Sequence, residues 1–530
     1  MSLAHDYLNA IVRRRREPME PLEFEPDWND KPRKFKVYED ATSFPLPTRE
    51  ALPPATVAAG LDPSPRTGTF TVARLGQMLR ESYGMLGRRL GVQGNNDRLT
   101  LPRYHNAVYH RGTASGGGLY PAEIYWVRGR STGTMPGVHS YSPPHHSMER
   151  LLVGDVSGQV RDAVPGLEGD QFLLVGIKFW KNAFKYNSFS YHVVTMDLGA
   201  LLGSWQTWAR AHGIELRPRL SFDELRLNRL LGLDTAMESV MAVVPLPGAL
   251  PDGHDGHDRA AGGHGAGDGA RVRMRESERS KTVIRFPATE AVHASIVADT
   301  TPVDETSLIG ARPVVPHSED WLPLPPPRPL TADLSTTLRS RRSSFGRFSA
   351  RPALRQAEFS ALLHAGSRAG ALASDAKRGD GGPALTRLVA FVNHVDGLSS
   401  GVYHHDAERH AIALVQDGDP GLFLQRNYFL SNYNLEQAAA VLVVLARPGA
   451  AMDTIGPRGY RYVNAEVGAV AQAVYTASAA LGVGCGAALG FDNVSFAEQL
   501  DLSGTGEWPL LLLMVGNERR GEPDFDYRLD

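Results

Sequence analysis

The sequence contains an internal repeat, and this repeat constrains the fold more than any other feature of the chain. Residues 191–247 match residues 460–516 at a constant offset of 269, without a gap over 57 positions. The identical pairs include Gly199 with Gly468, Phe222 with Phe491 and Asp223 with Asp492. Further upstream the offset becomes 264, so that Gly137 matches Gly401. A shared spacing over this length indicates an internal duplication and therefore two halves of one fold.

Each half shows the same order of predicted secondary structure. An amphipathic helix precedes an apolar strand, a short hairpin, a second apolar strand, a long apolar helix and a last strand. These elements are predicted in the first half over 70–86, 122–129, 137–143, 171–179, 192–213 and 239–246. In the second half they are predicted over 354–366, 387–395, 401–407, 438–446, 464–482 and 509–516. Because strands and helices are intermixed, the sequence predicts an α+β or three-layer class.

Two stretches without apolar periodicity separate the halves. Residues 251–280 are rich in Gly, His and Asp, and residues 321–330 contain a run of prolines, compositions that are typical of connectors. We interpret the linker histidines as solvated side chains rather than metal ligands, so no metal site is expected. The predicted segments are a lead-in over 1–70, a first half over 71–250, a flexible linker over 251–330 and a second half over 331–530.

The composition of the 530 residues excludes several classes of function. Lys and Arg number 56 against 58 Asp and Glu, so the net charge of −2 gives no electrostatic attraction to nucleic acid or to an anionic membrane. The single cysteine, Cys485, excludes an intrachain disulfide and a cysteine-based metal cluster. The first residues lack the apolar core of a signal peptide, and no apolar run reaches the length of a membrane span. We therefore expect a cytoplasmic protein.

Two motifs of the first half are candidates for chemistry. Ser115, Gly116 and Gly117 begin a glycine-rich loop that ends at Pro121, just before a predicted strand. Glycines allow the backbone to approach a flat or charged ligand closely, although a tight turn would explain the same residues. Lys185 and Tyr186 precede the long helix, and both become proton-transfer groups where burial lowers the pKa of the lysine. A surface Lys-Tyr pair is the alternative.

Three motifs of the second half suit a phosphate and a cofactor ring. Arg339, Arg341 and Ser343 cluster beside a predicted helix, an arrangement that suits a phosphate, although a solvated basic run would look the same. The glycine-rich segment 482–490 includes Ala488, Leu489 and Gly490, and its backbone N–H groups could face a cofactor ring. Arg519 and Arg520 follow the last strand and offer a further phosphate-binding guanidinium.

Together these motifs resemble the FMN-dependent nitroreductase superfamily. Within it, the chain resembles the SagB/ThcOx-type azoline dehydrogenases, which modify ribosomally made peptides. The residues that carry the resemblance are the RRS at Arg341–Ser343, SGGGLYP at 115–121, Lys185-Tyr186, the segment 456–472 and the lead-in at 28–47. The resemblance implies a tandem fold in which each half has a mostly antiparallel central sheet flanked by helices.

The superfamily binds FMN at the interface of a homodimer, so the resemblance implies an intrachain pseudodimer. The first half lacks the RRS motif, and the second half lacks the Ser and Tyr-Pro of the loop and reads Gly456-Pro457 at the Lys-Tyr position. Because these losses are complementary, one composite FMN site is expected, and the related second site is expected to be empty. The implied phosphate ligands are Arg339, Arg341, Ser343 and Arg519 or Arg520. The implied ring contacts are Ser115, Gly116, Gly117, Ala488, Leu489 and Gly490, with Lys185 and Tyr186 as base or proton shuttle.

The resemblance also implies the reaction. A base removes a proton from a peptide thiazoline or oxazoline while hydride passes to FMN, and dioxygen reoxidises the flavin once the thiazole or oxazole has formed. The implied partners are an azoline-bearing precursor peptide and a cyclodehydratase complex. Two alternatives stay open: an NAD(P)H-dependent nitroreductase or flavin reductase, and a flavin-less scaffold that binds a peptide.

Overall fold

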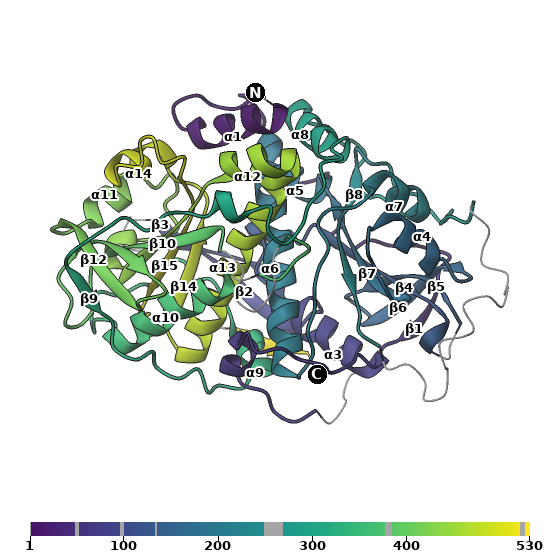
Figure 1. Cartoon of the computed structure of the whole chain (residues 1–530), viewed down its shortest axis with the longest axis horizontal. Coiled ribbons are helices and arrows are strands. Elements are labelled where there is room, and N and C mark those ends of the chain that lie inside the picture. Colours follow the sequence, from purple (N-terminus) through teal and green to yellow (C-terminus); the bar gives the residue numbers. More distant parts are fainter. Residues whose placement is uncertain are drawn as a thin grey trace.

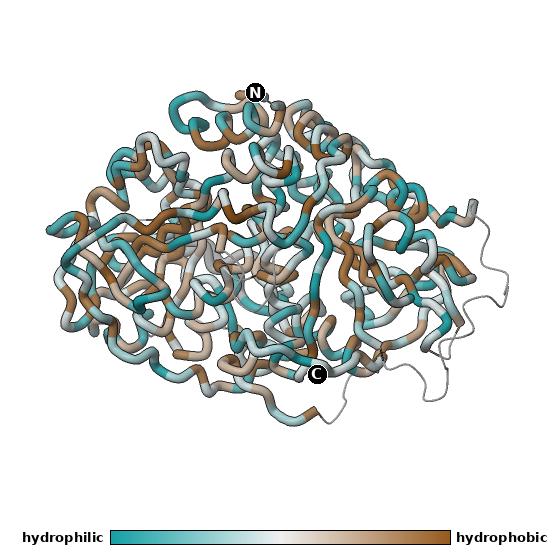
Figure 2. Tube along the Cα trace, in the orientation of Figure 1, coloured by the Kyte–Doolittle hydropathy of each residue, from teal (hydrophilic) through white to brown (hydrophobic). Residues whose placement is uncertain are grey.

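Two antiparallel sheets lie on either side of a central pair of long helices, α6 (Ser190–Ala211) and α13 (Gly459–Leu481) (Figure 1). The computed structural model describes residues 2–47, 52–95, 100–132, 135–248, 269–370, 372–376, 384–519 and 525–529. Hydrophobic residues follow the strands of both sheets (Figure 2). The predicted α+β fold with two similar halves is therefore confirmed.

The first half forms a sheet with the strand order β1-β6-β5-β4-β7-β8, in which every pairing is antiparallel. Its strands are β1 (Thr42–Pro45), β4 (Ala122–Arg128), β5 (Gly137–Ser142), β6 (Ser147–Val153), β7 (Gln171–Lys178) and β8 (Glu238–Pro245). Its shorter helices are α2 (Val57–Leu61), α3 (Val72–Ser82), α4 (Ser157–Ala163), α5 (Trp180–Tyr186) and α7 (Glu224–Leu231).

The second half repeats this sheet in the order β9-β12-β11-β10-β13-β15 and adds β14 at the far edge. Its strands are β9 (Trp321–Pro323), β10 (Thr386–Val392), β11 (Gly401–Asp406), β12 (Ala411–Asp417), β13 (Ala440–Ala446), β14 (Gly484–Ala488) and β15 (Trp508–Gly516). Its shorter helices are α9 (Leu334–Ser340), α10 (Gln356–Ala369), α11 (Gly421–Arg426), α12 (Pro448–Ile455) and α14 (Asn493–Gln499). Strands β4, β5 and β6 thus recur 264 residues later, and helices α6 and α7 recur 269 residues later.

The central strands separate a shared core from two outer cores. On β4, Ile124 and Trp126 belong to a large core that includes both long helices, whereas Tyr125 and Val127 face a core of the first half alone. Strand β10 divides its side chains in the same way between the shared core and a core of the second half. Since both faces are covered, apolar residues occupy consecutive positions in the middle of these strands rather than alternate positions. The shared core joins the halves.

The two long helices cross at a pair of glycines that the repeat places in register. A Cβ atom at Gly199 would lie 1.8 Å from the carbonyl oxygen of Ala465, and one at Gly468 would lie 1.9 Å from that of Met196. Residues 196 and 465 are themselves related by the offset of 269, so the crossing has approximate twofold symmetry. Only glycine permits the two backbones to approach this closely. The interface between the halves is therefore the pseudodimer interface that the sequence predicts.

Both ends of the chain and the connector pack against the halves. Strand β16 (Asp526–Arg528) pairs with β2 (Gly87–Asn95), which pairs with β3 (Thr100–His110), so the C-terminal segment joins a small sheet of the first half. Helix α1 (Leu3–Arg13) lies beside α8 (Pro287–Val297) at the top of Figure 1. Most of the predicted linker, from 269 to 330, is described and contains α8 and β9, while 251–268 lie outside the described residues. The domain boundaries stay a prediction.

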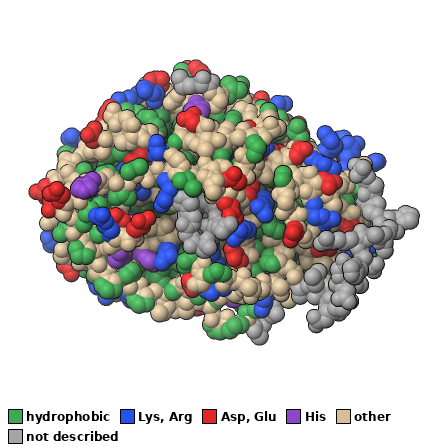
Figure 3. Space-filling view, viewed as in Figure 1, with side chains coloured by type: hydrophobic (Ala, Val, Ile, Leu, Met, Phe, Trp, Pro, Cys, Tyr) green, Lys and Arg blue, Asp and Glu red, His purple; other side chains and the backbone are tan. Residues whose placement is uncertain are grey.

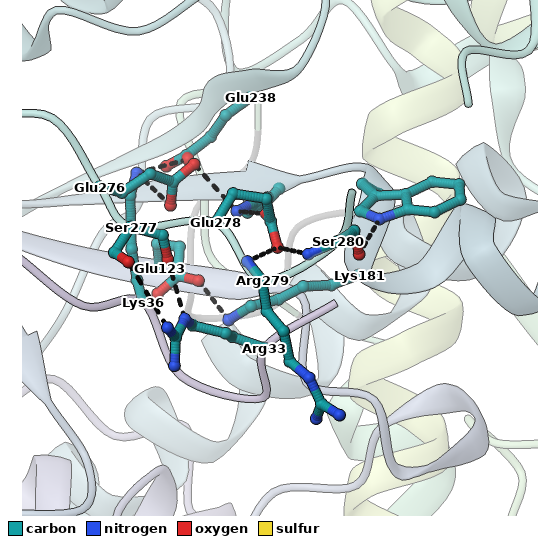
Figure 4. Close-up of polar contacts among 12 residues, drawn as sticks. Arg33, Lys36, Glu123, Lys181, Glu238, Glu276, Ser277, Glu278, Arg279 and Ser280 are labelled. Carbon is teal, nitrogen blue, oxygen red and sulfur yellow. Dashed lines mark hydrogen bonds and ion pairs between the residues drawn. The ribbon is translucent and has the colours of Figure 1, made fainter. Parts of the chain in front are cut away.

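A buried ion cluster ties the lead-in and the connector to the first sheet (Figure 4). In the second half, Arg387 and Glu507 form a buried pair, with Nη2 and Oε2 2.6 Å apart. Their counterparts in the first half are two acids, Glu123 and Glu238, which cannot neutralise each other. Lys181 of α5 pairs with Glu123, and Lys36 of the lead-in pairs with Glu238, with a Nζ–Oε2 distance of 2.6 Å. Lys36 of the lead-in therefore neutralises the buried carboxylate of Glu238, which has no arginine partner like that of Glu507 in the second half.

On the face shown in Figure 3, basic and acidic side chains are interspersed, as the small net charge leads us to expect. Within the described ranges, no helix combines the length and the apolar character of a membrane span. The same residues contain no cluster of three or more His, Cys, Asp or Glu side chains with the spacing of a metal site.

Candidate functional site

The glycine-rich loop of the first half lies at the interface and is held from both halves. Ser115 donates from Oγ to a carboxylate oxygen of Asp197 at 2.6 Å, and the N–H of Gly116 donates to the other at 2.7 Å. From the second half, Gln472 accepts from the N–H of Ala114 at 2.8 Å. Burial raises the pKa of Asp197 to about 7, against the lowering effect of its two hydrogen bonds. The loop is thus fixed by side chains of both long helices.

Lys185 and Tyr186 end helix α5 and contact this loop. Gly117 has a φ of 64°, and a Cβ atom there would lie 2.6 Å from the hydroxyl of Tyr186 and 3.0 Å from Nζ of Lys185. The lysine Nζ lies 5.0 Å from the centre of the Tyr186 ring. At the next residue, Gly118, with a φ of 66°, no atom lies within 4 Å of the Cβ position. The structure therefore brings together the two candidate motifs of the first half and leaves space beside them.

The basic cluster of the second half reaches across the interface. Arg341 is 6% exposed, and its guanidinium donates from Nε to the carbonyl oxygen of Gly112 at 2.8 Å and from Nη2 to that of Arg111 at 3.0 Å. Its Nη1 has no hydrogen bond among the described residues. Arg339 is half-buried, and in the same ranges its side chain makes no hydrogen bond or ion pair. Arg341 therefore joins the halves through two of its nitrogens, and a third nitrogen is available for an anion.

Tyr475 of α13 connects the basic cluster to the glycine-rich strand β14. Its hydroxyl lies 2.9 Å from Oγ of Ser343 and accepts from the N–H of Ala487 at 2.9 Å. Cys485 on the same strand is 2% exposed, and burial raises the pKa of its thiol to about 12, so it is not a nucleophile at neutral pH. The N–H of Arg519 donates to the carbonyl of Arg347 at 2.7 Å, which places the exit of β15 beside this cluster. Arg520 lies outside the described residues.

Beyond β14, the backbone of Leu489 and Gly490 offers two donors. No hydrogen bond from either N–H is present within the described part of the chain. The carbonyl of Gly490 accepts from the N–H of Phe429 at 2.8 Å, and Ala488 is 7% exposed. The pKa of the Tyr428 hydroxyl is raised mainly by burial, and the nearby side chain of Tyr186 raises it further. Tyr186 and the segment 488–490 therefore both lie near the stretch that carries Tyr428 and Phe429.

The corresponding place in the related second site is filled by the chain itself. Leu220 and Ser221 are the counterparts of Leu489 and Gly490 at the offset of 269. Their N–H groups donate to the carboxylate of Asp375, at 3.1 Å for Leu220 and 2.9 Å for Ser221, and Tyr462 donates to the same carboxylate at 2.8 Å. The two donors that are open in the candidate site are therefore occupied in its counterpart.

The expected counterpart of Lys185-Tyr186 in the second half, Gly456-Pro457, is wrong. Helix α5 corresponds to α12, and the offset of 269 places Thr454 and Ile455, not Gly456 and Pro457, at the positions of Lys185 and Tyr186. Gly456 and Pro457 instead begin the helical turn that follows the end of α12. The second half still lacks both side chains.

Sequence reasoning missed several residues that build the site. Asp197 and Gln472 hold the glycine-rich loop, and Tyr475 holds β14. The repeat carried one usable signal, because Asp197 matches Glu466, which accepts from the N–H of Leu385 at 2.6 Å in the second half. An acid at this position of a long helix thus holds the chain before the first central strand in both halves.

Comparisons with known proteins agree with this arrangement. Residues 338–517 match the family model described as the nitroreductase family. A predicted nitroreductase of Methanocaldococcus jannaschii is 35% identical over 127 residues, which are 24% of this chain and 62% of that protein. The alignment thus spans less than two thirds of that relative's length.

Solved structures extend the likeness to the whole chain. A nitroreductase-like protein of Anabaena variabilis has a TM-score of 0.70 at 22% identity, covering 98% of this chain and 100% of its own. A chain of the Escherichia coli microcin synthetase complex with bound truncated pro-microcin covers 38% of this chain and 71% of its own, at 18% identity and a TM-score of 0.27, which is too low to bear on function. The fold is that of nitroreductase-like proteins. Residues 338–517 of the present chain match the nitroreductase family, and the first half repeats the sheet of the second half.

Proposed function

We propose that the chain is an FMN-dependent oxidoreductase that oxidises peptide thiazolines or oxazolines to thiazoles or oxazoles. Two observations support the proposal: the contact of Lys185 and Tyr186 with Gly117, and the open N–H groups of Leu489 and Gly490 in the other half. Two proton-transfer side chains from one half would then share the site with backbone donors from the other half. Nitroreductase-family proteins typically bind FMN, and a precursor peptide delivered by a cyclodehydratase would be the substrate.

The residues present fit FMN. The side chain of Arg339 and Nη1 of Arg341 offer cations to a phosphate, and Ser343 offers a hydroxyl. The N–H groups of Leu489 and Gly490 are unsatisfied donors of the kind that a flavin ring accepts from. FMN would supply the two-electron acceptor, which dioxygen reoxidises.

The chain's own residues orient the substrate and move a proton. A flat ring would fit in the open space at Gly118. Tyr186 in its phenolate form, paired with the ammonium group of Lys185, would take the ring proton and become a neutral phenol. With this proton the azoline would lose a hydride, two hydrogens in all, and become aromatic, and FMN held by Arg339, Arg341 and Ser343 would supply the hydride acceptor. Aromatic side chains such as Tyr475, which is 4% exposed, exclude water from the cofactor side.

The proposal is tested first by the colour and the flavin content of the purified protein. We expect a yellow protein, and Arg341→Ala combined with Ser343→Ala should lose FMN. A colourless wild type that cannot be reconstituted with FMN would exclude every flavin-dependent function and favour the scaffold alternative.

The second test separates the chemistry from cofactor binding. Lys185→Ala combined with Tyr186→Phe should retain FMN while azoline oxidation, followed by the loss of two mass units from the peptide, falls by roughly a hundredfold or more. Thr454→Ala, at the matched position of α12, should change neither property. Unchanged oxidation in the double variant would remove Lys185 and Tyr186 from the mechanism. Oxidation of NAD(P)H by nitroaromatics or quinones with an inert azoline peptide would favour the reductase alternative.

A further inference from the structure

The end of the N-terminal helix reaches the backbone that borders the candidate site. Arg14, the residue after α1, donates from Nη1 to the side-chain oxygen of Asn493 at 2.7 Å and from Nη2 to the carbonyl oxygen of Leu489. A longer contact of 3.5 Å joins Nη2 to the carbonyl of Phe491. One guanidinium therefore holds three acceptors along the segment 489–493, which only a forked, multiply donating side chain can do.

The same guanidinium also contacts the other half. Its Cζ lies 4.5 Å from the centre of the Phe189 ring, and Phe189 follows Tyr186 by three residues. The Tyr186 and Phe189 rings are themselves 6.4 Å apart. Helix α1 is anchored next to this point, because the hydroxyl of Tyr7 donates to the carbonyl of Ser188 at 2.8 Å. Arg14 thus lies between the segment that carries Lys185 and Tyr186 and the segment that carries Leu489 and Gly490.

In the related second site, arginine side chains make the equivalent contacts. There, Arg461 donates to the carbonyl of Leu220 at 3.0 Å, and Arg458 donates to the carbonyl of Phe222 at 2.8 Å and to Glu224 at 2.6 Å. These acceptors are the counterparts, at the offset of 269, of the three acceptors of Arg14: Leu489, Phe491 and Asn493. The chain after the long helix is therefore held by arginine in both halves.

The two sites obtain this arginine from different elements. Arg458 and Arg461 lie at and near the start of α13, whereas the matching residues at the start of α6 are Phe189 and His192. The first half therefore has no guanidinium at the two positions that correspond to Arg458 and Arg461. Arg14 reaches the same acceptors from outside the duplicated fold, stacked on the phenylalanine that replaces one of the arginines.

We propose that Arg14 is a positioning residue of the candidate site, which makes the N-terminal helix part of that site. It fixes the carbonyls of Leu489 and Phe491, so that the N–H groups of Leu489 and Gly490 keep their direction toward the ligand. It also fixes the spacing between that backbone and Tyr186. The expected effect of Arg14 on cofactor binding rests on the proposed FMN function. Its hydrogen bonds to the backbone of Leu489 and Phe491 do not depend on that function.

The test compares Arg14→Ala and Arg14→Lys with Arg16→Ala. Arg16 is the matched control, because it also joins the end of α1 to the region of α14, through Glu498 at 2.9 Å and a longer contact of 3.9 Å with Asp492, without touching 489–491. Amide hydrogen exchange of the peptide spanning 486–493 is measured without added flavin, and the Kd for FMN is measured separately by flavin fluorescence. Melting temperatures and exchange elsewhere in the chain identify any variant that has unfolded.

We expect Arg14→Ala to speed exchange at 486–493 and to weaken FMN binding, each by roughly tenfold or more. Arg14→Lys keeps the charge but not the fork, so it should fold and still show most of both effects. Arg16→Ala should behave as the wild type does. Unchanged exchange in a folded Arg14→Lys or Arg14→Ala variant, or an equal effect of Arg16→Ala, would overturn the proposal. A wild type that binds no FMN would contradict the proposed function, while the exchange measurement would still decide the role of Arg14.

Discussion

Two adjacent glycines allow the contact between the loop and the Lys-Tyr pair to be tested with an internal control. Gly117 and Gly118 have nearly the same left-handed backbone, with φ of 64° and 66°. Alanine at either position costs about 1–2 kcal/mol of stability, because a Cβ atom is strained in this conformation. The surroundings of the two Cβ atoms differ, since one would meet Tyr186 and Lys185 and the other would meet nothing within 4 Å.

The size of the expected displacement follows from the distances. At Gly117 the new methyl would lie 2.6 Å from the Tyr186 hydroxyl, whereas ordinary contact begins near 3.4 Å, so the hydroxyl must move by roughly 0.8 Å. A misplacement of about 1 Å at a reacting group reduces a rate by about a hundredfold. Gly117→Ala should therefore lose about two orders of magnitude in kcat for the proposed azoline oxidation, while Gly118→Ala keeps its kcat.

The assay measures urea unfolding, FMN content and single-turnover flavin reduction by an azoline peptide for both variants. Both should unfold with similar losses of stability and retain the flavin. Equal rates in the two variants, whether both reduced or both normal, would refute the claim that Tyr186 and Lys185 act at the position where the structure places them.

Three further substitutions test other parts of the argument. Burial raises the pKa of Asp197 to about 7 in the folded state, so the folded protein keeps a proton that the unfolded chain releases, and stability falls as pH rises from about 4 to 7. Asp197→Asn should remove this dependence in urea unfolding between pH 5 and pH 8, a change of about 2.5 kcal/mol. Gly468→Ala would place a methyl 1.9 Å from a backbone oxygen and should cost about 3 kcal/mol or more in thermal unfolding, whereas Gly449→Ala, with open space around its Cβ, should be neutral or stabilising. Lys36→Met leaves Glu238 buried without its nearest cation and should lower the free energy of unfolding by about 3–5 kcal/mol; an unchanged midpoint would show that the lead-in is not needed for the first half.

The repeat was sufficient to predict the paired architecture. The constant offset of 269 over residues 191–247 predicted that α6 and α13 are equivalent, and the crossing of Gly199 with Gly468 confirms it. The apolar strands were also predicted, because their runs are continuous and sharply bounded. These features depend on local sequence, so they could be found without coordinates.

Residues that act across the chain could not be predicted in this way. Arg14 and Leu489 are 475 positions apart, and no local pattern marks an arginine after a short helix as a contact of a distant loop. Composition predicted a flexible connector before 330, yet Val272 within it is 3% exposed and belongs to the outer core of the first half. Asp375 gave no signal because its role depends on where Leu220 and Ser221 lie in space.

Joining the two halves in one chain allows the two interface sites to differ, and the carboxylate of Asp375 is an example. In a homodimer every substitution occurs twice, so a carboxylate that fills one interface site fills both. Here Asp375 closes one site and leaves its counterpart open, while Gly199 and Gly468 keep the shared crossing symmetric. The two sites can therefore diverge in sequence. The crossing of α6 and α13 cannot, because a side chain at either Gly199 or Gly468 would meet the backbone of the opposite helix. A single chain can thus keep one interface site open while its own carboxylate fills the other.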